Sequence, residues 1–161
     1  MLWSPGYVPK HSFIAWLAVQ NKLRIKDKLK AWGSIDNDIC GLCNVAVETI
    51  DHIFFECSVS LMVMQRVLQN CNINRNVLSW RREVAWFSRK TMGKSVLARV
   101  RRIAFVSSIY NIWRGRNRKI FEEVDVTGEE IFRWVRQDVL LKLLARNGES
   151  VALHQMQENW K

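Results

Sequence analysis

The sequence predicts an all-α protein, and three observations carry this prediction. Apolar residues recur at intervals of three and four along most of the chain, which is the spacing of one helix face. No alternating apolar and polar pattern extends beyond a few residues, so no strand is expected. Thr127 and Glu130 have the spacing of a capping box, which marks the start of a helix. Together these patterns leave turns and loops as the only other structure.

The N-terminal helices are short and follow each other closely. The first is predicted over residues 11–20, and the second ends at Gly33. The first carries Phe13, Trp16, Leu17 and Gln20 on one side, and the second carries Ile25, Leu29 and Trp32. The Ser34–Asn44 segment is rich in turn-forming residues and is predicted to be a loop. Thr49 is predicted to cap the next helix, and Phe54 and Phe55 are expected to pack against the first two helices.

The later helices are longer. A stripe of Leu61, Met64, Val67 and Leu68 predicts a helix from Ser58 to Gln69, with its apolar face in the core. Further helices are predicted from a Ser79 cap to Lys90, from about Lys94 to Phe121, and from Thr127 to Gly148. The helix of residues 94–121 places Val96, Val100, Ile103, Ser107, Tyr110, Trp113, Asn117 and Ile120 on one stripe. We expect a domain over 1–72, a basic helical region over 73–148 and a tail over 149–161.

Cys40, Cys43, His52 and Cys57 form the pattern Cys-x2-Cys-x8-His-x4-Cys. Three thiolates and one imidazole can close a tetrahedron around Zn²⁺, with bonds of about 2.3 Å to sulfur and about 2.0 Å to nitrogen. Because all four ligands come from the protein, no position remains for a reactive water, and the predicted zinc is structural. The loop supplies the first pair of ligands. Cys57 can reach the metal only if the helix that carries His52 stops or bends there.

Other uses of these residues remain open at this level. The Cys40 and Cys43 pair also has the spacing of a redox motif, although no βαβ pattern surrounds it. His52 can be a core histidine and Cys57 a buried thiol. A disulfide framework does not suit a chain of 161 residues with four cysteines and no secretory signal. Cys71 is predicted to take no part in the site.

The charge of the chain is distributed unevenly. Residues 1–57 carry six basic and six acidic side chains, whereas Arg75 to Lys119, the cationic block, carries thirteen basic residues and only Glu83 as an acid. Residues 120–161 return to five basic and eight acidic groups. Such a block attracts a polyanion, and nucleic acid is the common intracellular one. The absence of a signal-like N-terminus and of a long apolar run predicts an intracellular protein that does not enter a membrane.

The candidate nucleic-acid contacts lie in the helix of residues 94–121. They are Arg99, Arg101, Arg102, Arg114, Arg116, Arg118 and Lys119, and they would bind phosphates of RNA or DNA. Trp113 can stack on a base, but its place on the apolar stripe favours the core. The arginines can equally form a solvated helix face, as can the lysine-rich segment of residues 21–30.

The chain resembles a known family over about residues 1–70. Trp3, Pro9, Phe13, Trp16, Leu17, Asn21-Lys22-Leu23, Asp27-Lys28-Leu29, Trp32-Gly33, Cys40-Gly41-Leu42-Cys43, Glu48-Thr49, His52-Ile53-Phe54-Phe55 and Cys57 resemble the zinc-binding domain at the C-terminal end of plant LINE-type reverse transcriptases. Ile112-Trp113-Arg114 and Arg116-Asn117 resemble an element that often follows that domain. The resemblance implies that Cys40, Cys43, His52 and Cys57 hold zinc.

The same resemblance implies a role in gripping the nucleic acid template of a polymerase. The chain has no Asp-Asp pair of the kind that holds catalytic metal ions in a polymerase, so we expect no enzyme activity. The expected function is therefore that of a non-catalytic zinc domain, a detached fragment of a retrotransposon reverse transcriptase, with the polymerase module on another chain. The alternative is a zinc-stabilised protein interaction module. A cysteine oxidoreductase or a metal hydrolase would need an open or redox-active site.

Overall fold

A computed structural model describes residues 8–145 and 151–161 of the chain. The helices are α1 (Pro9–Val19), α2 (Lys26–Ala31), the π-helical turn η1 (His52–Glu56), α3 (Ser58–Asn70), α4 (Trp80–Lys90), α5 (Val96–Phe121), α6 (Gly128–Leu144) and α7 (Val151–Trp160). Within the described residues the only β-structure is one antiparallel bridge between Ile39 and Val47. The all-α prediction is confirmed. Trp3 and Gly148, which the sequence analysis singled out, lie outside the described residues.

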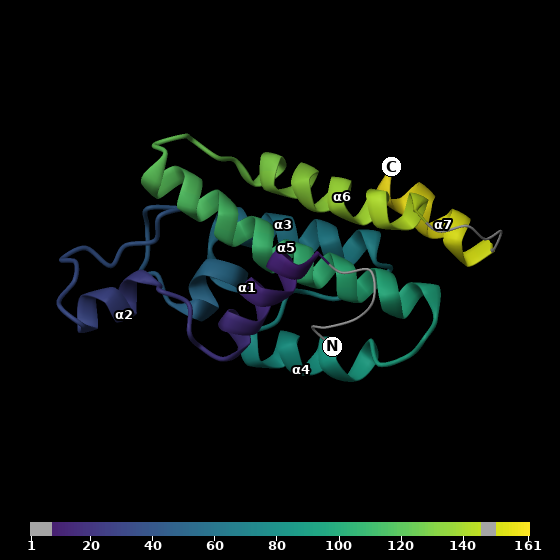
Figure 1. Ribbon diagram of the computed structural model, residues 1–161, viewed down its shortest axis with the longest axis horizontal. Coiled ribbons are helices and arrows are strands. Elements are labelled where there is room, and N and C mark those ends of the chain that lie inside the picture. The colour runs from purple at the N-terminus through teal and green to yellow at the C-terminus, as the bar shows by residue number, and fades with distance from the viewer. Residues whose placement is uncertain (1–7, 146–150) are drawn as a thin grey trace.

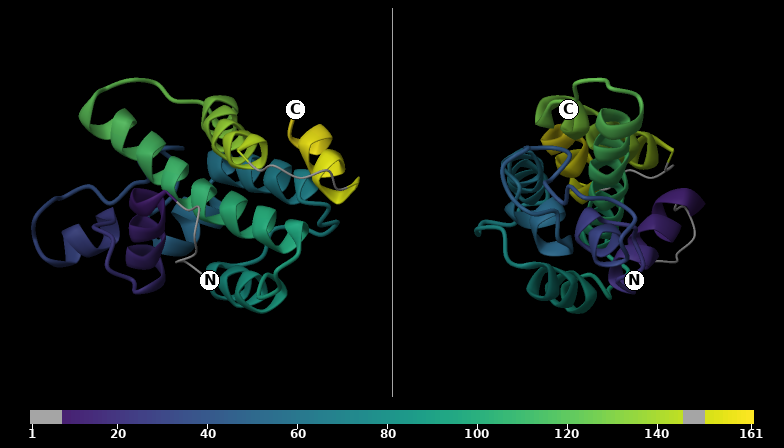
Figure 2. Two further views of the ribbon diagram at one scale, coloured as in Figure 1. Left: turned by 45° about the vertical axis from the view of Figure 1, so that its right-hand side comes forward. Right: turned by 90° about the vertical axis from the view of Figure 1, so that its left-hand side faces the viewer.

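Helix α5 is the centre of the molecule. It contacts α1, α3, α4, α6, α7 and η1, and α4 and α6 lie at opposite edges of the structure (Figures 1 and 2). The predicted single apolar stripe was therefore wrong for this helix. Buried residues such as Val100, Phe105 and Val106 face different directions, because neighbouring helices cover α5 on more than one side. Tyr110, Trp113 and Ile120 from the predicted stripe are only partly buried.

Helix α1 buries a different face from the predicted one. His11, Ser12, Ala15 and Ala18 are buried, whereas Phe13 is 49% exposed. The small side chains let α1 approach α5 closely, and the His11 ring stacks on Tyr110 with 4.0 Å between centroids. The large aromatic side chains of α1 cannot fit into so close a contact, so they lie at its margin.

The phenylalanines that follow His52 are buried, as predicted, and their rings contact aromatic residues of α4 and α5. Phe54 and Phe55 lie 5.3 and 5.6 Å from the Trp80 ring of α4, and Phe55 stacks at 6.5 Å on Phe105 of α5. They therefore join the metal-ligand segment to α4 and α5.

The C-terminal residues differ from the expected tail. Helix α7 contacts α3, α5 and α6, and it buries Leu153, Met156 and Trp160. The Arg136 side chain donates a hydrogen bond to the Trp160 carbonyl at 3.0 Å. One buried apolar cluster contains residues from both sides of position 72 and from α7.

Candidate metal centre

Cys40 and Cys43 lie in a tight loop that closes behind the Ile39 to Val47 bridge. The Cys40 amide donates to the Ala46 carbonyl at 2.8 Å, and the Asn44 amide donates to the Cys40 carbonyl at 3.0 Å. Asn44 has a positive φ of 56°, which asparagine tolerates better than most residues. The Leu42 amide lies 3.4 Å from the Cys40 sulfur. These bonds turn both cysteine side chains toward the same point.

His52 and Cys57 reach that point through the π-helical turn. The Thr49 hydroxyl accepts a hydrogen bond from the His52 amide at 3.1 Å, which confirms Thr49 as a cap. The Cys57 amide then donates to the His52 carbonyl at 2.7 Å, one residue further along than in an α-helix. Cys57 itself is extended, with ψ of 131°, and precedes α3. The predicted break at Cys57 is therefore present, and the wider turn brings both ligands to one side.

The four candidate ligand atoms all lie within 4.8 Å of one another. The Cys43 sulfur and the His52 Nε2 atom are 3.2 Å apart. These separations approach the edges of a tetrahedron with 2.3 Å bonds, which are about 3.8 Å long. Cys40, His52 and Cys57 are buried, and Cys43 is half-buried. Three sulfurs and one imidazole nitrogen in this arrangement match the ligand preference of Zn²⁺.

The electrostatics of the cluster also favour a bound cation. A hydrogen bond with Cys57, together with burial, raises the pKa of the Cys40 thiol. The same hydrogen bond lowers the pKa of Cys57, which lies at the start of α3. Without a metal, the Cys40 thiol therefore holds its proton more strongly than the Cys57 thiol does. A divalent cation stabilises both thiolates and removes this conflict.

Glu48 lies behind the centre and is fully buried. Its carboxylate accepts the Gly41 amide at 3.0 Å and the Lys26 amide at 3.0 Å. It also pairs with the Arg116 guanidinium of α5, at 2.6 Å for the shortest contact. One side chain thus joins the cysteine loop, the start of α2 and the central helix. The sequence analysis named Glu48 as part of a family motif and Arg116 as a candidate phosphate contact. It did not pair them, because nothing local shows that they meet.

The structure divides the predicted nucleic-acid contacts into two groups. Arg101 donates to the Cys71 and Asn72 carbonyls at the end of α3, and Arg102 donates to the Thr91 and Gly93 carbonyls. Lys119 donates to the Leu42 carbonyl at 2.9 Å and pairs with Asp125. Arg116 is buried with Glu48 and cannot contact a phosphate. These four side chains hold the fold together.

The remaining arginines lie nearer to solvent. Arg99 is half-exposed, Arg114 is exposed, and Arg118 is half-exposed beside Glu122. The guanidinium groups of Arg114 and Arg118 lie 4.5 and 5.6 Å from the Trp134 ring of α6.

A groove of about 550 Å³ lies between α1 and α5, which we call the α5 groove. Its lining consists of Ile14, Tyr110, Trp113, Arg114, Asn117, Arg118 and Glu122. It therefore combines two aromatic side chains with two of the predicted arginines. Trp113 is half-buried, with the Arg116 guanidinium 4.8 Å from its ring centre.

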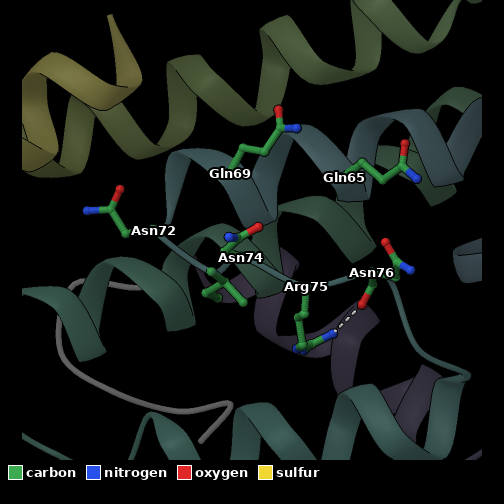
Figure 3. A pocket seen from close by; sticks show the side chains of 7 residues that line it. Gln65, Gln69, Asn72, Asn74, Arg75 and Asn76 are labelled. Atoms are coloured by element: carbon green, nitrogen blue, oxygen red, sulfur yellow. Dashed lines mark hydrogen bonds between the residues drawn. The ribbon is translucent and has the colours of Figure 1, made fainter.

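A second groove, of about 530 Å³, lies between α3 and the segment that follows it (Figure 3). Its lining is Gln65, Gln69, Asn72, Ile73, Asn74, Arg75 and Asn76. Arg75 is neutralised by Glu83 through two contacts of 2.7 Å, so this groove presents mainly uncharged amides. The sequence analysis missed it, although the density of Asn and Gln over residues 69–76 is visible there.

The fold and the site define an all-α protein with a closed, structural Cys3His zinc centre. Residues 1–63 match a family model described as zinc-binding in reverse transcriptase. No curated protein and no solved structure matched the chain. None of the helices in the described ranges combines the length and the apolar character that a membrane crossing requires.

Proposed function

We propose that this protein is a non-catalytic zinc domain that assists nucleic acid binding and derives from a retrotransposon reverse transcriptase. The observation that carries the proposal is the cationic block, with thirteen basic residues against one acid. That acid, Glu83, is fully buried against Arg75 and does not offset the surface charge. A surface of this kind binds phosphates by Coulomb attraction and by release of counterions.

The α5 groove supports the proposal at the level of a site. Arg114 and Arg118 supply positive charge, and Tyr110 and Trp113 supply aromatic surface at the same place. Basic grooves with aromatic side chains bind single strands, because phosphates meet the cations and bases stack on the rings. The zinc centre would help to position the α5 groove, since Glu48 and Arg116 fix the cysteine loop to α5.

The protein interaction module remains the competing function, and the salt dependence of binding separates the two. The test is to measure the affinity for a single-stranded RNA over a salt series. Phosphate contacts lower log affinity with a slope of about −0.7 per contact against log salt, whereas an apolar interface responds little. We expect Arg114→Gln with Arg118→Gln to flatten the slope by about 1.4, with the zinc content unchanged.

Arg116 is left unchanged in this variant because its replacement would break the buried ion pair with Glu48. Arg24→Gln with Arg133→Gln, at two exposed arginines elsewhere, is the control for the same change of net charge. If the parent protein binds RNA without dependence on salt, or does not bind it, the nucleic acid proposal is wrong.

A further inference from the structure

Four of the six exposed cations of the cationic block lie on α4, a helix that carries none of the individual residues named as candidate nucleic-acid contacts. Arg81, Arg82, Arg89 and Lys90 are all exposed. Within residues 8–145 and 151–161, none of them makes an ion pair or a side-chain hydrogen bond. By contrast, Arg75, Arg101, Arg102, Arg116, Arg118 and Lys119 of the same block all have polar partners. We call Arg81, Arg82, Arg89 and Lys90 the α4 cationic face.

The helical geometry places the four cations on one side. At 100° per residue, positions 81, 82, 89 and 90 fall within about half of the helix circumference. Trp80, Glu83 and Phe87 occupy the opposite side and are buried. The two pairs of cations are about 12 Å apart along the helix, given a rise of 1.5 Å per residue. Because the one acid of α4 points inward, the outer side carries positive charge only.

Several contacts fix α4 in place. The Trp80 amide donates to the Asp51 carboxylate at 2.9 Å, and Asp51 directly precedes the zinc ligand His52. The Trp80 ring packs on Phe54 and Phe55, which follow the same ligand. Further along, Phe87 stacks on Phe105 of α5 with 4.3 Å between centroids. The cations therefore lie on α4, a helix that the metal-ligand segment contacts directly.

We propose that the α4 cationic face is a second phosphate-binding surface for nucleic acid, positioned by the zinc centre. This inference rests on the proposed function and adds a site outside residues 1–63. Each unpaired cation that contacts a phosphate releases counterions condensed on the nucleic acid, so the face contributes directly to affinity. A membrane surface fits poorly, because binding there needs large exposed apolar side chains beside the cations. Ala85 is small, and the half-buried Trp86 ring has the Arg75 and Arg101 guanidinium groups 4.6 and 5.9 Å from its centre.

The test compares two triple variants of the full-length protein. The first is Arg81→Gln, Arg82→Gln and Arg89→Gln, and the second is the dispersed set Arg24→Gln, Arg133→Gln and Lys161→Gln, which removes the same charge from exposed sites elsewhere. Affinity for a single-stranded RNA is measured across a salt series. We expect the α4 variant to flatten the slope of log affinity against log salt by about 2, since each lost contact removes about 0.7. The dispersed variant should change the slope by less than half as much.

The same positions replaced by Lys should keep the parental slope, because the charge is retained. Zinc content and thermal unfolding of every variant show whether the fold is intact. An α4 variant with the same slope as the dispersed variant overturns the inference. If Arg114→Gln with Arg118→Gln weakens binding while the α4 variant does not, the proposed function stands without the α4 cationic face. Salt-independent binding by the parent protein overturns both.

Discussion

At the scale of single residues, the buried pair of Glu48 and Arg116 has the largest consequence. Glu48→Gln would keep a hydrogen-bond acceptor but would leave the Arg116 charge buried without a counter-charge. Breaking a buried ion pair by changing one partner typically costs about 3–5 kcal/mol. We therefore expect the free energy of unfolding to fall by that amount in urea titrations of the zinc-loaded protein.

A matched control is Glu122→Gln, which removes the partner of Arg118 at the surface. Its side chain is 56% exposed, so the change should cost less than about 1 kcal/mol. Replacing both members of the buried pair, with Glu48→Gln and Arg116→Met, should restore part of the lost stability, because no charge is then left uncompensated. A Glu48→Gln variant as stable as the Glu122→Gln variant would show that the pair does not hold the cysteine loop to α5.

At the scale of elements, the start of α4 shows how a cap can come from a distant segment. Ser79 was predicted to cap this helix, and it occupies the N-cap position without a side-chain bond. Asp51 accepts the Trp80 amide instead. Asp51→Ala should therefore destabilise the protein by about 1 kcal/mol, the usual cost of a lost cap, whereas Ser79→Ala should be nearly neutral. Thermal unfolding of the two variants gives the comparison, and a larger loss from Ser79→Ala would reverse the assignment.

At the scale of the whole molecule, the zinc centre should stabilise more than the domain that carries its ligands. We expect one zinc per chain by elemental analysis, and its loss in Cys43→Ser or His52→Ala. Structural zinc supplies on the order of 10 kcal/mol of apparent binding energy in small sites. Because Glu48, Asp51 and the neighbouring phenylalanines contact α4 and α5, hydrogen exchange should accelerate in those helices as well as in residues 8–70.

Cys71→Ser is the control for that experiment. This thiol is completely buried, its pKa is raised to about 12 by burial, and it lies outside the cluster of four ligands. Its replacement should leave the zinc content at one per chain. Loss of zinc from this variant, or exchange confined to residues 8–70 after removal of the metal, would contradict the prediction.

The sequence by itself determined the metal ligands and most of the helices. A ligand set such as Cys40, Cys43, His52 and Cys57 can be recognised because its members are close in the chain and chemically distinctive. The capping box of Thr127 and Glu130 is likewise a local pattern, and the structure confirms both of its hydrogen bonds. Local patterns of this kind depend on backbone geometry over a few residues, so the rest of the fold does not alter them.

Only the tertiary structure decided which cations are available to a ligand. Arg114 and Arg116 lie on opposite faces of α5, and the spacing does not show which face is covered; Arg116 is buried against Glu48, 68 positions earlier, and Arg114 is exposed. The same holds for α4, whose single acid, Glu83, is buried while its four basic side chains are exposed. Pairing and burial are set by residues far apart in the chain, and helical periodicity contains no information about which neighbour will cover a given face.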